Sequence, residues 1–184
     1  MIAGLAGAII VAVLALPPMR DLLERVMIAH MLVQIPLLAV GGALIATALP
    51  VQLRARTEPW NRNGVSGILM ALIASSWWMV PRALDWALAS PRMELVKFVS
   101  LPLLVGVPLS LSWSHLGGIG RGFVIVNVLP MGAVVGWLYV AAPLRVCNFY
   151  LVEQQVVAGA GLLGASLILG VAAASLAFRS APAR

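Results

Sequence analysis

Soft metal ligands are gathered in one part of the sequence. Met27, His30 and Met31 stand together near the start of an apolar run, Met79 lies late in the next run, and Met93 follows in a connecting segment. Thioether and imidazole groups suit Cu(I). One hypothesis is therefore a Cu(I) site with His30 at its centre and the four methionines as thioether ligands. The alternative is that the methionines are ordinary packing residues and that no cofactor is bound.

A second set of side chains is polar or charged but lies within or beside apolar runs. It comprises Gln34, Arg82, Asp85, Glu153 and Gln154. Polar side chains inside a membrane need partners and are functional candidates by default. Arg82 and Asp85 are three residues apart, a spacing that allows them to pair on one helix face. Gln34 shares a helix face with His30, and Glu153 and Gln154 are expected to hydrogen-bond to neighbouring helices.

The two histidines limit the cofactor chemistry. His30 lies near the start of one apolar run and His115 at the end of another, so we expect most of the bilayer to separate them. This excludes a haem iron held by both histidines. A haem b carrier would need His30 with an unusual second ligand such as Met79, or none. No Ser/His/Asp set, H-E-x-x-H, phosphate loop or C-x-x-C occurs, so we do not predict an enzyme.

The composition requires a lipid environment for the elements that carry these residues. The chain is 62% hydrophobic and only 10% charged, with a mean hydropathy of +1.03. A soluble domain has about 25% charged residues. The net charge of +6 is spread singly along the chain rather than in basic runs, which excludes nucleic acid as the expected partner. We predict an all-α, multi-pass membrane protein in contact with lipid.

Six apolar runs are long enough to cross a hydrocarbon core of about 30 Å. They span roughly residues 2–19, 26–50, 65–89, 97–114, 121–143 and 149–178 of a single membrane domain, and five spans are the alternative. Both termini then lie on one side. Lys and Arg are shared equally between the two sides, six against six. The acid-poor segment RARTEPWNR favours a cytoplasmic location for the termini.

With these residues placed, the chain resembles the CtaG-type family of cytochrome c oxidase assembly factors, which are linked to copper delivery to haem–copper oxidases. Three elements in the same order carry the resemblance. The family motif W-H-x-P-x-x-x-D-x-A-L is matched by Trp78, Pro81, Asp85, Ala87 and Leu88, and the following helix ends at Trp113. HMLVQ at His30–Gln34 resembles the family's HMxQH, and EQQVVAG at Glu153–Gly159 resembles its DQQ-x-x-G.

The departures from the family pattern affect its histidines. Met79 stands in place of the histidine of W-H-x-P, Met93 and Lys97 stand in place of the loop histidines, and Gln34 replaces the second histidine of HMxQH. Two interpretations follow. Either the copper site is preserved with thioether ligands, or the fold is preserved without the metal.

The resemblance implies a protein of the bacterial inner membrane that serves aerobic respiration. It would assist copper loading or assembly of a haem–copper terminal oxidase, or act as an accessory subunit beside its other membrane subunits. The alternatives are a structural anchor subunit of another membrane redox complex and a haem b electron carrier.

Overall fold

The computed structural model describes residues 2–180, which are all-α: no strand occurs in that range. The helices in chain order are α1 (Ile2–Ala15), α2 (Pro17–Glu24), α3 (Met27–Ala29), η1 (His30–Gln34), α4 (Ile35–Thr47), α5 (Val51–Asn61), α6 (Val65–Met79), α7 (Pro81–Ala89), α8 (Pro91–Ser100), η2 (Leu101–Gly106), α9 (Val107–Trp113), α10 (Gly118–Ala141) and α11 (Val152–Ser180). The elements η1 and η2 are π-helical and continue into the α-helices beside them.

The predicted bundle of membrane helices is confirmed. Among the described residues, four helical segments are long and apolar enough to cross a membrane: Met27–Thr47, Pro91–Trp113, Gly118–Ala141 and Val152–Leu176. Two further spans result if each of two bent helix pairs counts as one. These pairs are α1 with α2, bent by 71°, and α6 with α7, bent by 72°.

Prolines explain where the bent pairs break. Pro17 and Pro81 each begin the second helix of a pair, and Leu16 and Val80 before them are extended, with ψ values of 134° and 122°. A residue before proline is disfavoured in the α conformation, so the helix ends there. The predicted runs 2–19 and 65–89 each fall on a bent pair rather than on one continuous helix. The run predicted from residue 97 belongs to a longer helical segment that begins at Pro91.

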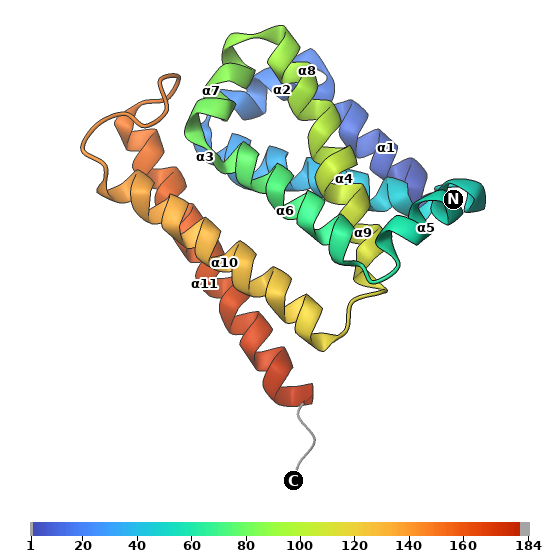
Figure 1. Cartoon of the computed structure of the whole chain (residues 1–184). Helices are drawn as coiled ribbons and strands as arrows, with labels where there is room; N and C mark the ends of the chain where they lie inside the picture. Colours follow the sequence, from blue (N-terminus) through green and yellow to red (C-terminus); the bar gives the residue numbers. More distant parts are fainter. Residues whose placement is uncertain (1, 181–184) are drawn as a thin grey trace.

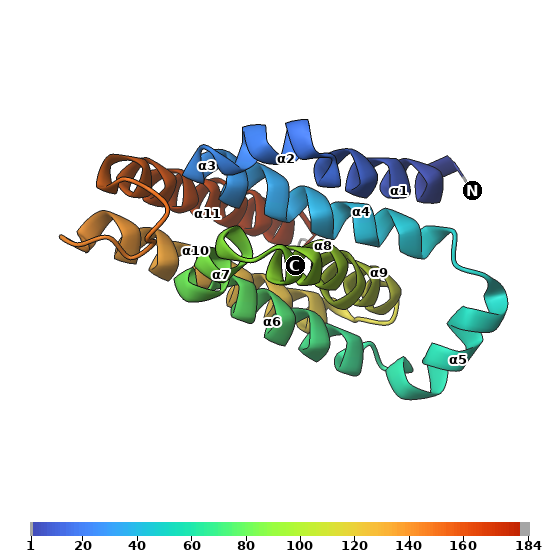
Figure 2. The same ribbon diagram turned by 90° about the horizontal axis from the view of Figure 1, so that it is seen from above.

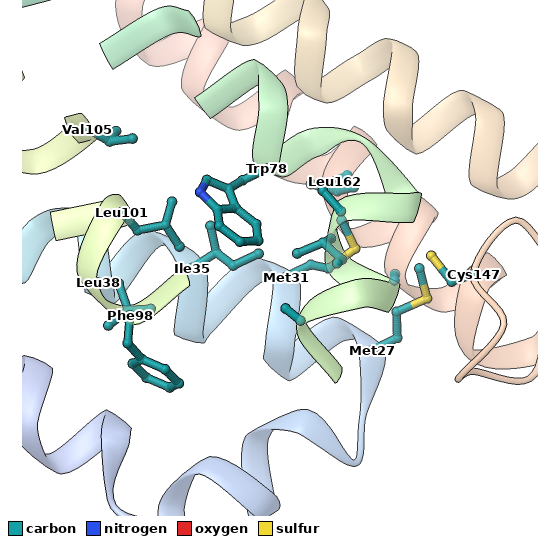
Figure 3. Close-up of a cluster of buried hydrophobic side chains, with 14 of the residues drawn as sticks. Met27, Met31, Ile35, Leu38, Trp78, Phe98, Leu101, Val105, Cys147 and Leu162 are labelled. Carbon is teal, nitrogen blue, oxygen red and sulfur yellow. The ribbon is translucent and has the colours of Figure 1, made fainter. Parts of the chain in front are cut away.

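Two groups of helices are visible in Figures 1 and 2. Helices α1, α4, α6, α8 and α9 pack together, whereas α10 and α11 form a long hairpin that extends beyond them. Within the hairpin, the helices cross closely at two glycines. A Cβ at Gly136 would lie 2.8 Å from the Gly159 carbonyl oxygen, so only glycine fits there without a shift of the backbone. Figure 3 shows the main apolar core, which includes Met27, Met31, Trp78 and Cys147.

The two π-helical segments share a local cause. Each is followed two residues later by a proline, Pro36 after η1 and Pro108 after η2. In a regular α-helix a proline ring clashes with the carbonyl four residues earlier and has no N–H for it. A wider π turn relieves that clash. The wider turn in η1 leaves His30, Met31 and Gln34 all buried.

Candidate functional site: a buried ammonium among three acceptors

A buried polar centre lies where α2, η1, α8 and the segment before α11 meet. We call it the Lys97 centre; it comprises Glu24, His30, Gln34, Lys97 and Tyr150. The Lys97 ammonium donates to Glu24 Oε1 at 2.5 Å, to His30 Nε2 at 3.2 Å and to Gln34 Oε1 at 3.2 Å. A lysine ammonium has three N–H donors, so all of them have partners. Lys97, His30 and Gln34 are fully buried, and the Glu24 side chain is 11% exposed.

The surrounding bonds assign the tautomer of His30. The Tyr150 hydroxyl donates to the backbone carbonyl of Glu24 at 2.8 Å, so its oxygen is an acceptor for His30 Nδ1 at 2.9 Å. His30 therefore carries its proton on Nδ1, and Nε2 is left with a lone pair for Lys97. The neutral imidazole and the ammonium fit each other without like-charge repulsion.

A second ion pair lies beside the Lys97 centre and joins the same two helices. Arg20 of α2 contacts Glu94 of α8 at 3.0 Å and Asp21 at 3.0 Å. Thus α2 presents Arg20 and Glu24 to Glu94 and Lys97 of α8, with the charges complementary at both positions. The two pairs fasten α2, the bent end of the first span, onto α8.

Local sequence explains how Lys97 becomes buried. Ser90 precedes α8 and Pro91 occupies its first turn, a position that proline favours. Because α8 begins there, Lys97 lies nearly two helical turns inside it and faces η1. Sequence reasoning did not place Glu24 or Tyr150 at a site, and it named Lys97 only as the replacement of a loop histidine. Arg20 and Glu24 are four residues apart and Glu94 and Lys97 are three apart, so each pair shares a helix face, but this spacing does not indicate that the two helices meet.

A second polar centre fixes the segment between α10 and α11. We call it the Asp85 centre; it comprises Asp85, Asn148 and Gln155. Asp85 Oδ2 accepts from the backbone N–H of Asn148 at 2.8 Å and from its side-chain amide at 2.9 Å. Gln155 Oε1 accepts from the N–H of Val146 at 2.8 Å, and its amide donates to the Tyr139 carbonyl at 3.1 Å. These bonds tie the segment to α7 and α11, and they tie α11 to α10.

The predicted Arg82–Asp85 pair is wrong for this structure. Arg82 is exposed, whereas Asp85 is 6% exposed and faces the backbone of residue 148. Glu153 is exposed, and Gln154 is half-buried with its Oε1 unpartnered among the described atoms. The polar residue of this stretch that holds the structure together is Gln155.

Cys147 lies between the two centres as a buried thiol. It is 1% exposed, and its Sγ is 3.7 Å from the Tyr139 hydroxyl. Burial raises the pKa of the Cys147 thiol to about 11, so the group is protonated near neutral pH. Burial likewise raises the pKa of the Tyr150 phenol above its usual value. Cys147 therefore acts as a small apolar residue of the core.

The predicted copper ligands are only partly brought together. Met27 and Met31 are buried in the main core, where Figure 3 shows them near Cys147, and Met93 packs at its edge. Met79 is half-buried and lies outside that cluster. No group of three or more His, Cys, Asp or Glu side chains suited to a metal occurs in the described range.

His30 as arranged here does not fit a copper ion. Its Nδ1 is bonded to Tyr150, and its Nε2 faces the ammonium of Lys97. A second cation at Nε2 would be repelled by that ammonium. Copper binding stays a prediction, and its strongest remaining donors are the sulfur atoms of the core.

The predicted separation of the histidines agrees with the structure. His30 contacts Lys97 near the start of the span Pro91–Trp113, whereas the exposed His115 follows the other end of that span. Eighteen helical residues correspond to roughly 25 Å. The two imidazoles therefore cannot share one iron.

Comparison with known proteins adds no relative: no family model, no curated protein and no solved structure matches the chain.

Proposed function

We propose that this chain is a CtaG-like membrane protein of aerobic respiration that supports a haem–copper terminal oxidase as an accessory or assembly subunit. The observation that carries the proposal is the environment of Lys97. In the comparison with the CtaG-type pattern, Lys97 occupies the position of a loop histidine. Its ammonium contacts His30 and Gln34 of the HMLVQ segment. A fixed cation thus occupies the place where the family pattern leads one to expect a metal.

The contacts between the resembling segments support the same proposal. His30 of the HMLVQ segment bonds to Tyr150, which lies three residues before the EQQVVAG segment. Asp85 of the motif that begins at Trp78 bonds to Asn148, which lies with Tyr150 in the connection between α10 and α11. Sequence elements far apart in the chain therefore meet at one end of the bundle, as residues of one inherited centre would.

The hairpin of α10 and α11 offers the surface for a membrane partner. In the most apolar part of each of these two helices 17% of the residues are buried, against 39% and 44% in the two continuous spans of the other group. Large apolar side chains therefore face outward along it, including Val126, Val134, Trp137, Leu167 and Ile168. Lipid covers such a surface in isolation, and helices of other subunits can replace lipid there.

The test is purification of the tagged full chain from native membranes in a mild detergent. We expect it to co-purify with a haem–copper oxidase, detected by reduced-minus-oxidised haem spectra and by mass spectrometry of the subunits. Deletion of the chain should lower the amount of assembled oxidase. Recovery of the chain with no redox complex, together with unchanged oxidase levels in the deletion strain, would contradict the proposal.

Copper handling is the second candidate, favoured by the shared burial of Met27, Met31 and Cys147 in one core. Elemental analysis of the separated chain, prepared under reducing and copper-replete conditions, distinguishes it. Stoichiometric copper that disappears when Met27 and Met31 are both replaced by leucine would establish the chaperone function in place of the metal-free one. An optical spectrum of the same sample with a Soret band would instead support the haem b alternative.

We further propose that the protein lies in a bacterial inner membrane with both termini in the cytoplasm. Fusions of a green fluorescent protein and of alkaline phosphatase to the C-terminus test the orientation. Fluorescence without phosphatase activity is expected, and the reverse result would invert the assignment.

A further inference from the structure

Three acceptors of different chemistry converge on one buried point in the Lys97 centre. They are the Glu24 carboxylate, the His30 imidazole and the Gln34 amide oxygen, at 2.5, 3.2 and 3.2 Å from the Lys97 nitrogen. We propose that these three residues form a binding site for a primary ammonium group, and that the chain fills it with its own lysine. When Lys97 is shortened, the site takes primary organic ammonium ions as a class.

The acceptors are held in place by bonds that do not involve Lys97. Gln34 donates its amide to Glu24 at 3.2 Å, His30 is held by Tyr150 at 2.9 Å, and Tyr150 is held by the backbone of Glu24 at 2.8 Å. Each acceptor therefore keeps its direction when the lysine is shortened. Preorganisation of this kind lowers the entropic cost of binding a replacement ligand.

Electrostatics supply the affinity. Glu24 is mostly buried, and a buried carboxylate without a counter-ion is strongly destabilising. Arg20 forms its ion pairs with Glu94 and Asp21, so Lys97 is the cation in direct contact with the Glu24 carboxylate. The Phe98 ring lies 4.9 Å from the Lys97 nitrogen and adds a cation–π contact on another side. The distances and the three-fold acceptor set match an –NH₃⁺ donor rather than a bare metal ion.

Chemical rescue tests the site in the purified full-length protein. Lys97→Ala removes the atoms of n-propylammonium, so thermal unfolding of this variant is followed with increasing n-propylammonium chloride. We expect a lower Tm than in the native chain, and a rise that follows the logarithm of ligand concentration above the Kd and reaches about 3–6 °C at ten times the Kd. The native chain, whose site is filled, should not respond. n-Propanol and tetramethylammonium chloride are the matched controls, since one lacks the charge and the other lacks N–H donors.

The double variant Lys97→Ala/Glu24→Gln should lose the rescue. Equal stabilisation by n-propanol, rescue that persists in the double variant, or a Lys97→Ala protein as stable as the native chain would each overturn the proposal. The test involves no partner complex, so its failure leaves the proposed oxidase function intact.

A second measurement applies when Lys97→Ala is not recovered in folded form. Lys97→Met keeps the side-chain length to within one atom and removes the charge, and it is combined with Glu24→Gln in a double-mutant cycle. We expect each single change to reduce the yield of monodisperse protein and the double change to restore part of it, because the buried charges are then removed together. Additive losses would show that the two residues do not form one site.

Discussion

The Lys97 centre and the Asp85 centre lie at the same end of the bundle but differ in how completely their charges are matched. Lys97 meets an opposite charge and two neutral acceptors, which use all three of its N–H groups. Asp85 meets only the two neutral N–H donors of Asn148, and its Oδ1 has no partner among the described residues. The difference indicates that an ion pair joins the helices at the Lys97 centre. At the Asp85 centre, hydrogen bonds to neutral donors hold the connection between α10 and α11.

Removal of one charge from the Lys97 centre should have the largest effect. Glu24→Gln leaves a buried ammonium without its counter-ion, and we expect a loss of about 3–5 kcal/mol in the free energy of unfolding. Denaturant titration of the purified protein in detergent micelles measures the loss. Glu58→Gln, at an exposed position on α5, is the matched control and should change stability by less than about 0.5 kcal/mol.

Loss of the imidazole should have the next largest effect. His30→Ala removes an acceptor of the Lys97 ammonium and the donor to Tyr150, so we expect a cost of about 2–3 kcal/mol in the same assay. His115→Ala is the control, since His115 is exposed at the far end of the bundle. Equal losses of unfolding free energy for the two substitutions would contradict a stabilising role of His30 in the Lys97 centre.

Neutralisation of Asp85 should lower the free energy of unfolding by less than either change at the Lys97 centre. Asp85→Asn keeps an oxygen for the N–H groups of Asn148, and we expect a loss of about 1 kcal/mol in the free energy of unfolding. Arg82→Gln should be neutral because Arg82 is exposed and does not pair with Asp85. A cost for Asp85→Asn as large as that of Glu24→Gln would remove the distinction between the two centres.

The smallest expected effect concerns Cys147, whose thiol lies beside the Asp85 centre. The labelling rate of this thiol reports on changes at the Asp85 centre. Cys147 is buried and its thiol pKa is raised to about 11 from 9.0, so a maleimide should label it slowly at pH 8. Because the folded pKa is the higher one, the thiol's contribution to stability is present below pH 9 and is lost as the pH rises towards 11. Asp85→Asn should accelerate labelling several-fold, whereas Arg82→Gln should not.

The sequence was sufficient for the membrane bundle because twenty-residue apolar runs have few other structures available. It was insufficient for the bends, since Pro17 and Pro81 permit either a kink or a break. The pairing of Lys97 with Glu24 could not be predicted either, because 73 residues separate them. The positions of charged residues within one helix do not indicate which other helix it packs against. Asp85 was identified as an important polar residue, but its partner came from the chain between α10 and α11 rather than from its own helix.

The prolines that bend the first and third spans also determine how the protein fits the bilayer. Helix α1 has 14 residues and α6 has 15, lengths of about 21 and 22 Å, whereas the hydrocarbon core is about 30 Å thick. Helices α10 and α11, with 24 and 29 residues, reach about 36 and 43 Å. Helices α1 and α6 are therefore shorter than the hydrocarbon core, whereas the two helices of the hairpin are longer than it. In a bilayer we expect this mismatch to thin the membrane beside α1 and α6 and to tilt the hairpin.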